Sequence, residues 1–499
     1  MKTSIKIFFY SFLLFTFNSH KVHSQLVSDF RVNDDTTNYS QYRAKVGTDN
    51  NGNFVVVWYD QRSGSNIRLK GQLFDSNANR IRNSFQINDD IYNTIPSLSV
   101  RGDGSFAVSW NVISLKFRIF DNLGLPLSDE IILEDTVTGF VNALGCDSAG
   151  NFIVIFNQDS STINNLYYQK LNQIGKKIGS KVKVSDISTI STYQGMAIAV
   201  KRDGSCLITW NDKRPPAGSD ADDIYFQMFD RFGNRIGANQ KVNDDASNFN
   251  LQLSPKISSD ISGRFVIAWY DDRLNNSHSE IYAQNYLNDG SKFGINYRVS
   301  ESSTNYDKGI CNIFKKENGE FLIGWTESRP FISSPYFQRY DSSGIKIGNN
   351  FLVSNQLTTI DKIYSDLIIH NNKIISVWND ERNDPFDIYC NIRSFTNPDT
   401  TVNIIQTSSS IPENFLMHQN YPNPFNSSTI IEFEIKQSDN YKLEIVNSLG
   451  QVIQILFQRN FYYGTYQFNL DATNLSSGMY YSILSSKKER IVKSFVILK

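Results

Sequence analysis

The chain has 499 residues, enough for two or three domains with full hydrophobic cores. Its 49 basic and 50 acidic residues balance, so the composition argues against a nucleic acid or an anionic membrane as partner. The chain contains 35 Phe and 25 Tyr together with many Asn, Ser and Asp. This mixture of strand formers and turn formers predicts an all-β protein.

The first predicted element is a secretory signal peptide at residues 1–24. A lysine-bearing start precedes an apolar run from Ile5 to Phe17, which is too short to span a bilayer comfortably. Cleavage is expected before Gln25, and no later stretch approaches transmembrane length. The mature chain is therefore expected to be exported.

Four cysteines are too few and too widely spaced for a disulfide scaffold. They fall at different places in the repeat described next, so four small buried side chains are favoured over two disulfide bonds. The four are Cys146, Cys206, Cys311 and Cys390.

Regularly spaced tryptophans mark a repeat. They stand at positions 58, 110, 210, 269, 325 and 378, and Phe156 fills the double gap between 110 and 210. The resulting intervals run from 46 to 59 residues, a period close to that of propeller blades.

Each repeat predicts four short strands. In the unit around Trp210 they are MAIAV (196–200), CLITW (206–210), DIYFQMFD (223–230) and QKVNDD (240–245), separated by turn sequences. Four antiparallel strands per unit is the composition of a propeller blade.

The closing strands are out of phase with the tryptophan strands. Each kind occurs seven times when Phe156 is counted. The first closing strand, FRVNDD at residue 30, precedes the first tryptophan strand, whereas the last unit ends at IRSFTNP without one. In a closed ring the N-terminal strand can supply the missing outer strand and remove an exposed edge. We therefore expect a seven-bladed β-propeller over residues 25–398, closed by its N-terminal strand.

Five units carry the motif W-x-[D/E]-x-R. The copies are WYDQR at 58, WNDKR at 210, WYDDR at 269, WTESR at 325 and WNDER at 378. The expected strand order places these loops and the Asn-Asp-Asp segments on one rim and the glycine turns on the other. Each acid can cap a turn or pair with the arginine of its own or a neighbouring unit. Repetition favours this structural role, because a catalytic centre needs different residues that converge on one point.

The same rim is the candidate ligand site. The loops after Trp210 and Trp269 are the longest of their kind and lie on adjacent units, and long loops on a rigid scaffold often bind ligands. The candidate binding residues are Asp212, Arg214, Asp271, Arg273, Asp380 and Arg382.

Signals for cofactors and catalysis are few. The stretch SDADD (219–223) could offer oxygen ligands to calcium, but it lacks the spacing of a dedicated calcium loop, and no other cofactor is expected. Only His278, His370 and His418 follow the signal peptide, and they stand far apart. There is no HExxH, GxSxG or phosphate-loop motif.

The C-terminal segment has a different character. After a polar linker at 399–411, alternating sequences such as TIIEFEI predict a small β-sandwich over residues 412–499. Its motifs are YPNPF, SLGQ, LSSGMYY and a short basic final strand. The segment resembles the type A C-terminal sorting domains of the type IX secretion system in Bacteroidetes. The matching residues are Tyr421, Pro422, Asn423, Pro424, Phe425, Gly450, Gly478 and Tyr480.

This resemblance implies a transport route rather than an activity. It implies export to the periplasm, passage across the outer membrane with the type IX machinery as partner, and display on the surface or release. Two functions remain open for the repeats: a binding propeller for a glycan or a protein, and a carbohydrate-active enzyme, either a glycoside hydrolase or a lyase, that uses acids of the loop rim. Binding is favoured, because no pair of carboxylates stands out.

Overall fold

The computed structural model describes residues 25–62, 67–89, 95–111, 113–160, 163–186, 195–213, 222–245, 250–274, 278–300, 306–329, 332–354, 361–383, 385–396, 404–408, 412–437, 439–461, 463–472 and 475–499. The signal peptide predicted at 1–24 lies outside them. Within these ranges the protein is all-β and has no helix, and its strands form nine four-stranded sheets.

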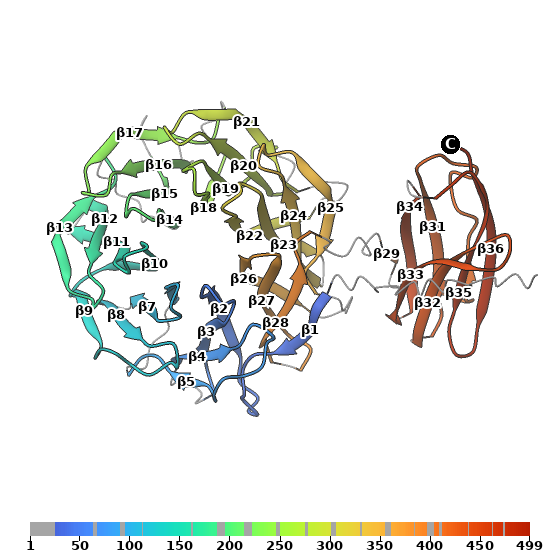
Figure 1. Cartoon of the computed structure of the whole chain (residues 1–499), viewed down its shortest axis with the longest axis horizontal. Coiled ribbons are helices and arrows are strands. Elements are labelled where there is room, and N and C mark those ends of the chain that lie inside the picture. Colours follow the sequence, from blue (N-terminus) through green and yellow to red (C-terminus); the bar gives the residue numbers. More distant parts are fainter. Residues whose placement is uncertain are drawn as a thin grey trace, which may run out of the picture.

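Seven sheets lie side by side round a ring (Figure 1), and we number them ring sheets 1 to 7. Sheet 1 holds β2 (Gln41–Thr48), β3 (Phe54–Asp60), β4 (Arg68–Phe74) and β5 (Phe85–Gln86). Sheet 2 holds β6 (Ser97–Val100), β7 (Phe106–Asn111), β8 (Leu115–Phe120) and β9 (Ile131–Glu134). Sheet 3 holds β10 (Thr138–Cys146), β11 (Phe152–Ser160), β12 (Ile163–Leu171) and β13 (Lys177–Lys183). Sheet 4 holds β14 (Met196–Val200), β15 (Cys206–Asp212), β16 (Asp223–Phe229) and β17 (Arg235–Lys241).

The remaining ring sheets follow the same order from the inner to the outer strand. Sheet 5 holds β18 (Gln252–Ser259), β19 (Phe265–Asp271), β20 (Glu280–Tyr286) and β21 (Lys292–Arg298). Sheet 6 holds β22 (Asp307–Lys315), β23 (Phe321–Arg329), β24 (Ile332–Tyr340) and β25 (Lys346–Leu352). Sheet 7 holds β26 (Lys362–His370), β27 (Lys373–Asp380), β28 (Asp387–Ser394) and, as its fourth strand, β1 (Gln25–Arg31).

The chain's first described strand and its last ring strands belong to one sheet. β1 pairs antiparallel with β28, so that Phe30 lies opposite Cys390 and Arg31 opposite Tyr389. β1 therefore occupies the outer position that β5 holds in sheet 1 and β17 holds in sheet 4.

Buried side chains fill the space between neighbouring ring sheets. The second strand of each sheet is almost wholly buried, because sheets cover it on both faces, and it reads as a run of apolar residues such as FVVVWYD in β3. All six tryptophans are at most 1% exposed. One buried cluster joins Trp58 of sheet 1 to Ile375 and Val377 of sheet 7, and equivalent clusters join every other adjacent pair.

The outer strands differ from their sequence-based prediction. The predicted strand at 240–245 begins earlier, because β17 starts at Arg235, directly after the turn, and ends at Lys241. A bulge divides this strand, and Gly237 adopts a φ of 71° there. The buried Gln227 side chain donates across the bulge to the carbonyls of Ile236 (3.1 Å) and Gly237 (3.2 Å). The Asn-Asp-Asp segment consequently lies beyond the strand, in the loop.

The C-terminal residues form the other two sheets. One holds β29 (Ile404–Ser408), β30 (Leu416–Met417), β31 (Ser428–Ile435) and β34 (Gly464–Asp471), and the other holds β32 (Asp439–Asn447), β33 (Val452–Phe461), β35 (Gly478–Ser485) and β36 (Arg490–Ile497). Both contribute to one core, which includes Phe433 and Leu470 from the first sheet and Leu443 and Phe495 from the second. This arrangement is a two-layer β-sandwich.

Three of the four cysteines have described side chains, and all three are unpaired. Cys206 and Cys390 are buried, and Cys146 is half-buried. Burial raises the pKa of Cys206 to about 12, so this thiol is inert at neutral pH. Within the described parts of the chain no helix is long and apolar enough to cross a membrane.

Candidate functional site

The W-x-D-x-R motif is a compact hydrogen-bonded unit in the copies that are described in full. In sheet 5 the Trp269 indole donates to Asp271 Oδ2 at 2.7 Å. The backbone N–H of Arg273 donates to Asp271 Oδ1 at 2.9 Å, and the Arg273 guanidinium pairs with the same carboxylate at 2.8 Å. Asp271 is only 1% exposed, so the acid joins a buried ring to a loop cation.

Two further copies repeat this geometry. Asp60 accepts from the Trp58 indole at 2.9 Å and from Arg62 Nη2 at 2.8 Å. Asp380 accepts from the Trp378 indole at 2.9 Å and from Arg382 Nε at 2.9 Å. The Arg382 guanidinium also lies 3.9 Å from the ring centroid of Tyr389.

The remaining copies are described in part. Asp212 is fully buried and accepts from the Trp210 indole at 3.2 Å, but Arg214 lies outside the described residues, as does the Arg329 side chain. Among described atoms, the indole N–H groups of Trp110 and Trp325 have no hydrogen-bond partner. The unit of Trp110 lacks the acid, and that of Trp325 has Glu327 in place of Asp. The short Asp side chain is therefore the group that satisfies the buried indole.

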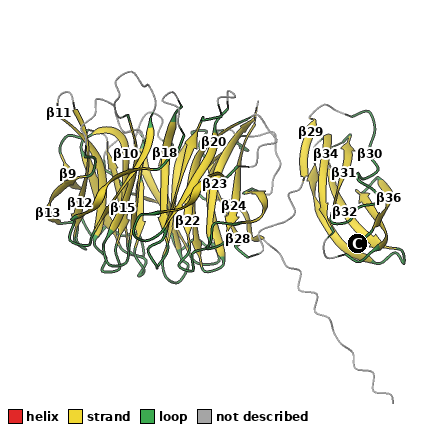
Figure 2. Ribbon diagram, turned by 90° about the horizontal axis from the view of Figure 1, so that it is seen from above, coloured by secondary structure: helices red, strands yellow, loops and turns green. Residues whose placement is uncertain are grey.

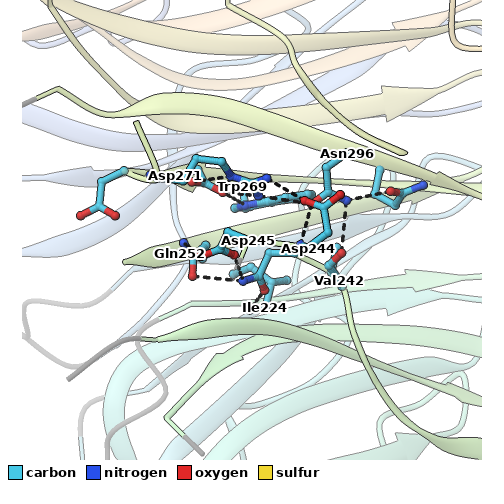
Figure 3. Close-up of polar contacts among 12 residues, drawn as sticks. Ile224, Val242, Asp244, Asp245, Gln252, Trp269, Asp271 and Asn296 are labelled. Carbon is cyan, nitrogen blue, oxygen red and sulfur yellow. Dashed lines mark hydrogen bonds and ion pairs between the residues drawn. The ribbon is translucent and has the colours of Figure 1, made fainter. Parts of the chain in front are cut away.

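The arginines also reach the preceding sheet. Arg273 Nη1 pairs with Asp244 Oδ1 at 2.7 Å, and Asp244 follows the outer strand of sheet 4 (Figure 3). Asn296 of sheet 5 completes the contact, since it accepts from the Asp244 N–H at 2.9 Å and donates to the Val242 carbonyl at 3.2 Å. Residues of Asn-Asp-Asp thus hold the next copy of W-x-D-x-R.

An equivalent contact joins sheet 7, through the segment after β1, to sheet 1. Arg62 of sheet 1 pairs with Asp34 at 3.0 Å, and Asp34 is the middle residue of the Asn-Asp-Asp that follows β1. In sheet 2, which has no motif arginine, Asp89 instead pairs with Arg118 at 3.1 Å.

Electrostatics agree with this pairing. Burial disfavours the charged form of Arg273, but the bonds to Asp271 and Asp244 outweigh it and raise the Arg273 pKa. Burial likewise opposes ionisation of Asp380, yet hydrogen bonds from Arg382 and Trp378 lower the Asp380 pKa. Arg273 and Asp380 are therefore held in their charged forms.

The structure brings the predicted site residues together in the units of Trp269 and Trp378. Asp271 contacts Arg273, and Asp380 contacts Arg382, as described above. Ligand binding by these residues and by Asp212 and Arg214 stays a prediction.

The described residues contain no group of three or more His, Cys, Asp or Glu side chains that could hold a metal ion. The calcium prediction for SDADD falls partly outside them, because Asp220 lies in an undescribed segment.

A cavity of about 740 Å³ opens on the other rim, which the sequence analysis did not single out. The turns between the first and second strands of sheets 1 to 4 line it. Its polar lining includes Arg101, Asp103, Asp147, Ser148 and Arg202. No local motif indicates this cavity, because residues from four separate repeats form it.

The residues predicted for the sorting motif frame the C-terminal core. Phe425 is 5% exposed and lies 5.7 Å from Phe495, which also stacks on Tyr480 at 5.9 Å. Asn423 Oδ1 accepts from the Val496 N–H at 2.9 Å. Of the others, Pro422 and Pro424 follow cis peptide bonds, Tyr421 is exposed, Gly450 turns the chain between β32 and β33 with a φ of 77°, and Gly478 begins β35.

Residues 419–498 match the family of secretion system C-terminal sorting domains. The C-terminal segment is a sorting domain of the type IX secretion system. It marks the chain for export to the cell surface or for secretion, and it implies contact with the secretion machinery. The sorting domain says nothing about what the ring sheets bind.

Solved structures with propeller-like folds resemble the chain weakly. PorZ, a surface component of the type IX secretion system of Porphyromonas gingivalis, shares 13% identity with a TM-score of 0.39, over 90% of this chain and 58% of PorZ. A Fusarium graminearum GH93 α-L-arabinofuranosidase shares 9% identity with a TM-score of 0.42, over 74% of this chain and 98% of the enzyme. A Penicillium chrysogenum α-L-arabinanase shares 9% identity with a TM-score of 0.40, over 60% of this chain and 93% of the enzyme.

Likenesses at these scores support no conclusion about activity or ligand. The chain spans less than two thirds of the length of PorZ. No curated protein matches the chain in sequence.

Proposed function

We propose that this protein is an exported seven-bladed β-propeller, closed by its N-terminal strand, that binds a glycan or protein ligand outside the cell. In this proposal residues 1–24 are a signal peptide, 25–398 the propeller, 399–411 a linker and 412–499 the sorting domain.

Closure of the ring is supported by the contacts between its ends. β1 supplies the outer strand of sheet 7, and sheets 7 and 1 share a buried core as the other neighbouring sheets do. Arg62 and Asp34 add an ion pair across the same junction. The pairing of β1 with β28 covers a strand edge that would otherwise be exposed.

Pairing within the motif carries the preference for binding over catalysis. Asp60, Asp271 and Asp380 are each at most 2% exposed and are each bonded to a tryptophan and an arginine. A general acid or base must reach the substrate proton that it transfers, and these three carboxylates face protein donors instead. We assign them the task of holding neighbouring blades together.

The test is a screen of the mature full-length protein. Binding to a panel of immobilised polysaccharides and extracellular proteins is measured alongside release of reducing or unsaturated sugar ends. Saturable binding without product is the expected result. Release of sugar ends would instead support a glycoside hydrolase or lyase, and no binding to any member of the panel would contradict the proposal.

A further inference from the structure

The seven inner strands contribute one equivalent residue each to a ring about the central axis. We identify them by register, as the residues that pair with the position directly before the tryptophan or Phe156. They are Lys45, Ser97, Ala143, Ala197, Lys256, Asn312 and Asp366. Sheets 5, 6, 7 and 1 thus provide large polar side chains, whereas sheets 2, 3 and 4 provide small ones.

Contacts of Asp366 show that the polar side chains converge. Its carboxylate accepts from the Asn312 side chain of sheet 6 and, at 3.1 Å, from the Val46 N–H of sheet 1. Those two sheets flank sheet 7 on opposite sides, so the carboxylate lies on the axial side of β26. Burial raises the Asp366 pKa, and the charges of Lys45 and Lys256 oppose that rise. By register, Lys45 and Lys256 occupy the same inner-strand position as Asp366, in sheets 1 and 5.

The cavity described above lies on the side of the small residues. Cys146 and Val200 line it, and each stands three residues along its strand from Ala143 or Ala197, roughly 10 Å at the rise of a β-strand. The inner strands of sheets 3 and 4 therefore lead from the cavity to the level of the axial ring that contains Lys45 and Lys256. Its volume of about 740 Å³ is in the range of ligand-binding sites.

The charged side chains that line the cavity differ in how firmly protein groups hold them. Asp103 accepts from the Ser105 N–H at 2.9 Å, and Asp147 accepts from Asn151 at 2.8 and 2.9 Å, so each acid is engaged within its own turn. Arg202 pairs with Glu317, which belongs to the turn of sheet 6, and the two side chains are 66% and 68% exposed. Exposed pairs contribute little, so an anionic ligand can replace Glu317 at Arg202.

We propose that this cavity, together with the axial ring beyond it, binds an acidic sugar unit of a polysaccharide. Arg202 lies at the edge of the cavity, and Lys45 and Lys256 of the axial ring are the cations that receive the carboxylate of the sugar. The inference rests on the glycan branch of the proposed function and names its ligand class and its site. Neutral glycans lack the group that these three cations recognise.

The experiment measures the affinity of the mature full-length protein for polygalacturonic acid and for its methyl ester, which has the same chain without the charge. The acid form should bind at least about tenfold more tightly, as expected when a charged contact is lost. Arg202→Glu and Lys45→Gln should each weaken binding of the acid form by about tenfold. Arg231→Glu makes the same charge change in an exposed outer turn of sheet 4 and should have less than about a twofold effect.

A variant that gains affinity is included because misfolding cannot explain a gain in binding. Glu317→Gln releases Arg202 from its partner and should strengthen binding about two- to fivefold, the range open to an exposed ion pair. Equal binding of acid and ester would overturn the acidic ligand class while leaving glycan binding in place. Acid-selective binding that Arg202→Glu and Lys45→Gln leave unchanged would show that the ligand does not bind at the cavity and the axial ring. Absence of binding to every polysaccharide would overturn the glycan function as well.

Discussion

At the scale of single residues, the motif acid determines whether a buried tryptophan is satisfied. Asp271→Ala removes the acceptor of the Trp269 indole and the partner of the Arg273 guanidinium. Both donors would remain largely buried, so we expect a loss of unfolding free energy on the order of 1 to 3 kcal/mol. Denaturant melts of the purified variant measure it.

The control for Asp271→Ala is Asp129→Ala, at an exposed position of sheet 2, which should leave the melt nearly unchanged. Asp60→Ala and Asp380→Ala should behave like Asp271→Ala, because the same contacts surround them. If Asp271→Ala melted like the parent and lost a ligand, the structural role would be wrong and the ligand-binding prediction for these residues would gain.

A second residue-scale prediction concerns pH. Lys315 has a side chain only 4% exposed, and burial lowers its pKa to about 8. In the unfolded chain its pKa returns to about 10.5. Below pH 8, folding buries a charged lysine, and this lowers the stability of the folded chain. Between pH 8 and about 10.5 the unfolded chain binds more protons than the folded chain, so the stability rises with pH across this window.

Lys315→Met should remove that rise. We expect the stability difference between the parent and this variant to change by about 3 kcal/mol in favour of the parent as the pH goes from 7.5 to 10.5. Thermal melts at several pH values test this, with Lys176→Met, at an exposed position, as control. A constant difference across the window would contradict the lowered pKa.

At the scale of elements, the stability of the ring is expected to depend on β1. This strand is the outer strand of a sheet whose other three strands, β26, β27 and β28, come from the last repeat of the ring. Deletion of residues 25–36 removes this strand and the Arg62–Asp34 pair together. The edge of β28 is then exposed, and the first and last sheets lose part of their shared core. We expect a markedly lower melting temperature for the whole ring, or aggregation.

Phe30→Ala is the milder companion to this deletion. Phe30 packs edge-on against Phe74 at 5.5 Å, so this variant weakens the same junction without removing the strand and should give an intermediate melt. A deletion variant that unfolds at the parental temperature would refute closure by the N-terminal strand.

At the scale of the whole molecule, folding and export depend on separate sets of contacts. The ring sheets and the C-terminal sandwich have distinct buried clusters, and Figure 2 shows them as two groups of strands. Truncation after Pro412 should therefore leave a folded ring that stays in the periplasm. Cell fractionation with surface proteolysis locates the product, and normal surface display of the truncated chain would show that residues 413–499 are not needed for export.

The all-β class, the repeat, the phase shift of the closing strands and the identity of the sorting domain could all be predicted from the sequence. These features are local or periodic: apolar alternation and turn residues act within a few positions, and YPNPF and LSSGMYY are read from neighbouring residues. The Gln227 and Gly237 pair, with its equivalents in other sheets, had a sequence signal too, a glutamine ten residues before a glycine. It was missed because each residue alone resembles an ordinary strand position.

Contacts between distant repeats could not be predicted from the sequence. Asp366 reaches Val46 across 320 residues, and this separation does not follow from spacing within a repeat. The repeat predicts seven similar units, but the axial ring from Lys45 to Asp366 differs at nearly every position, and its asymmetry exists only where the inner strands meet. Side chains converge on the axis because the ring brings distant repeats together, so a reading of one repeat at a time cannot reveal the cavity or its cations.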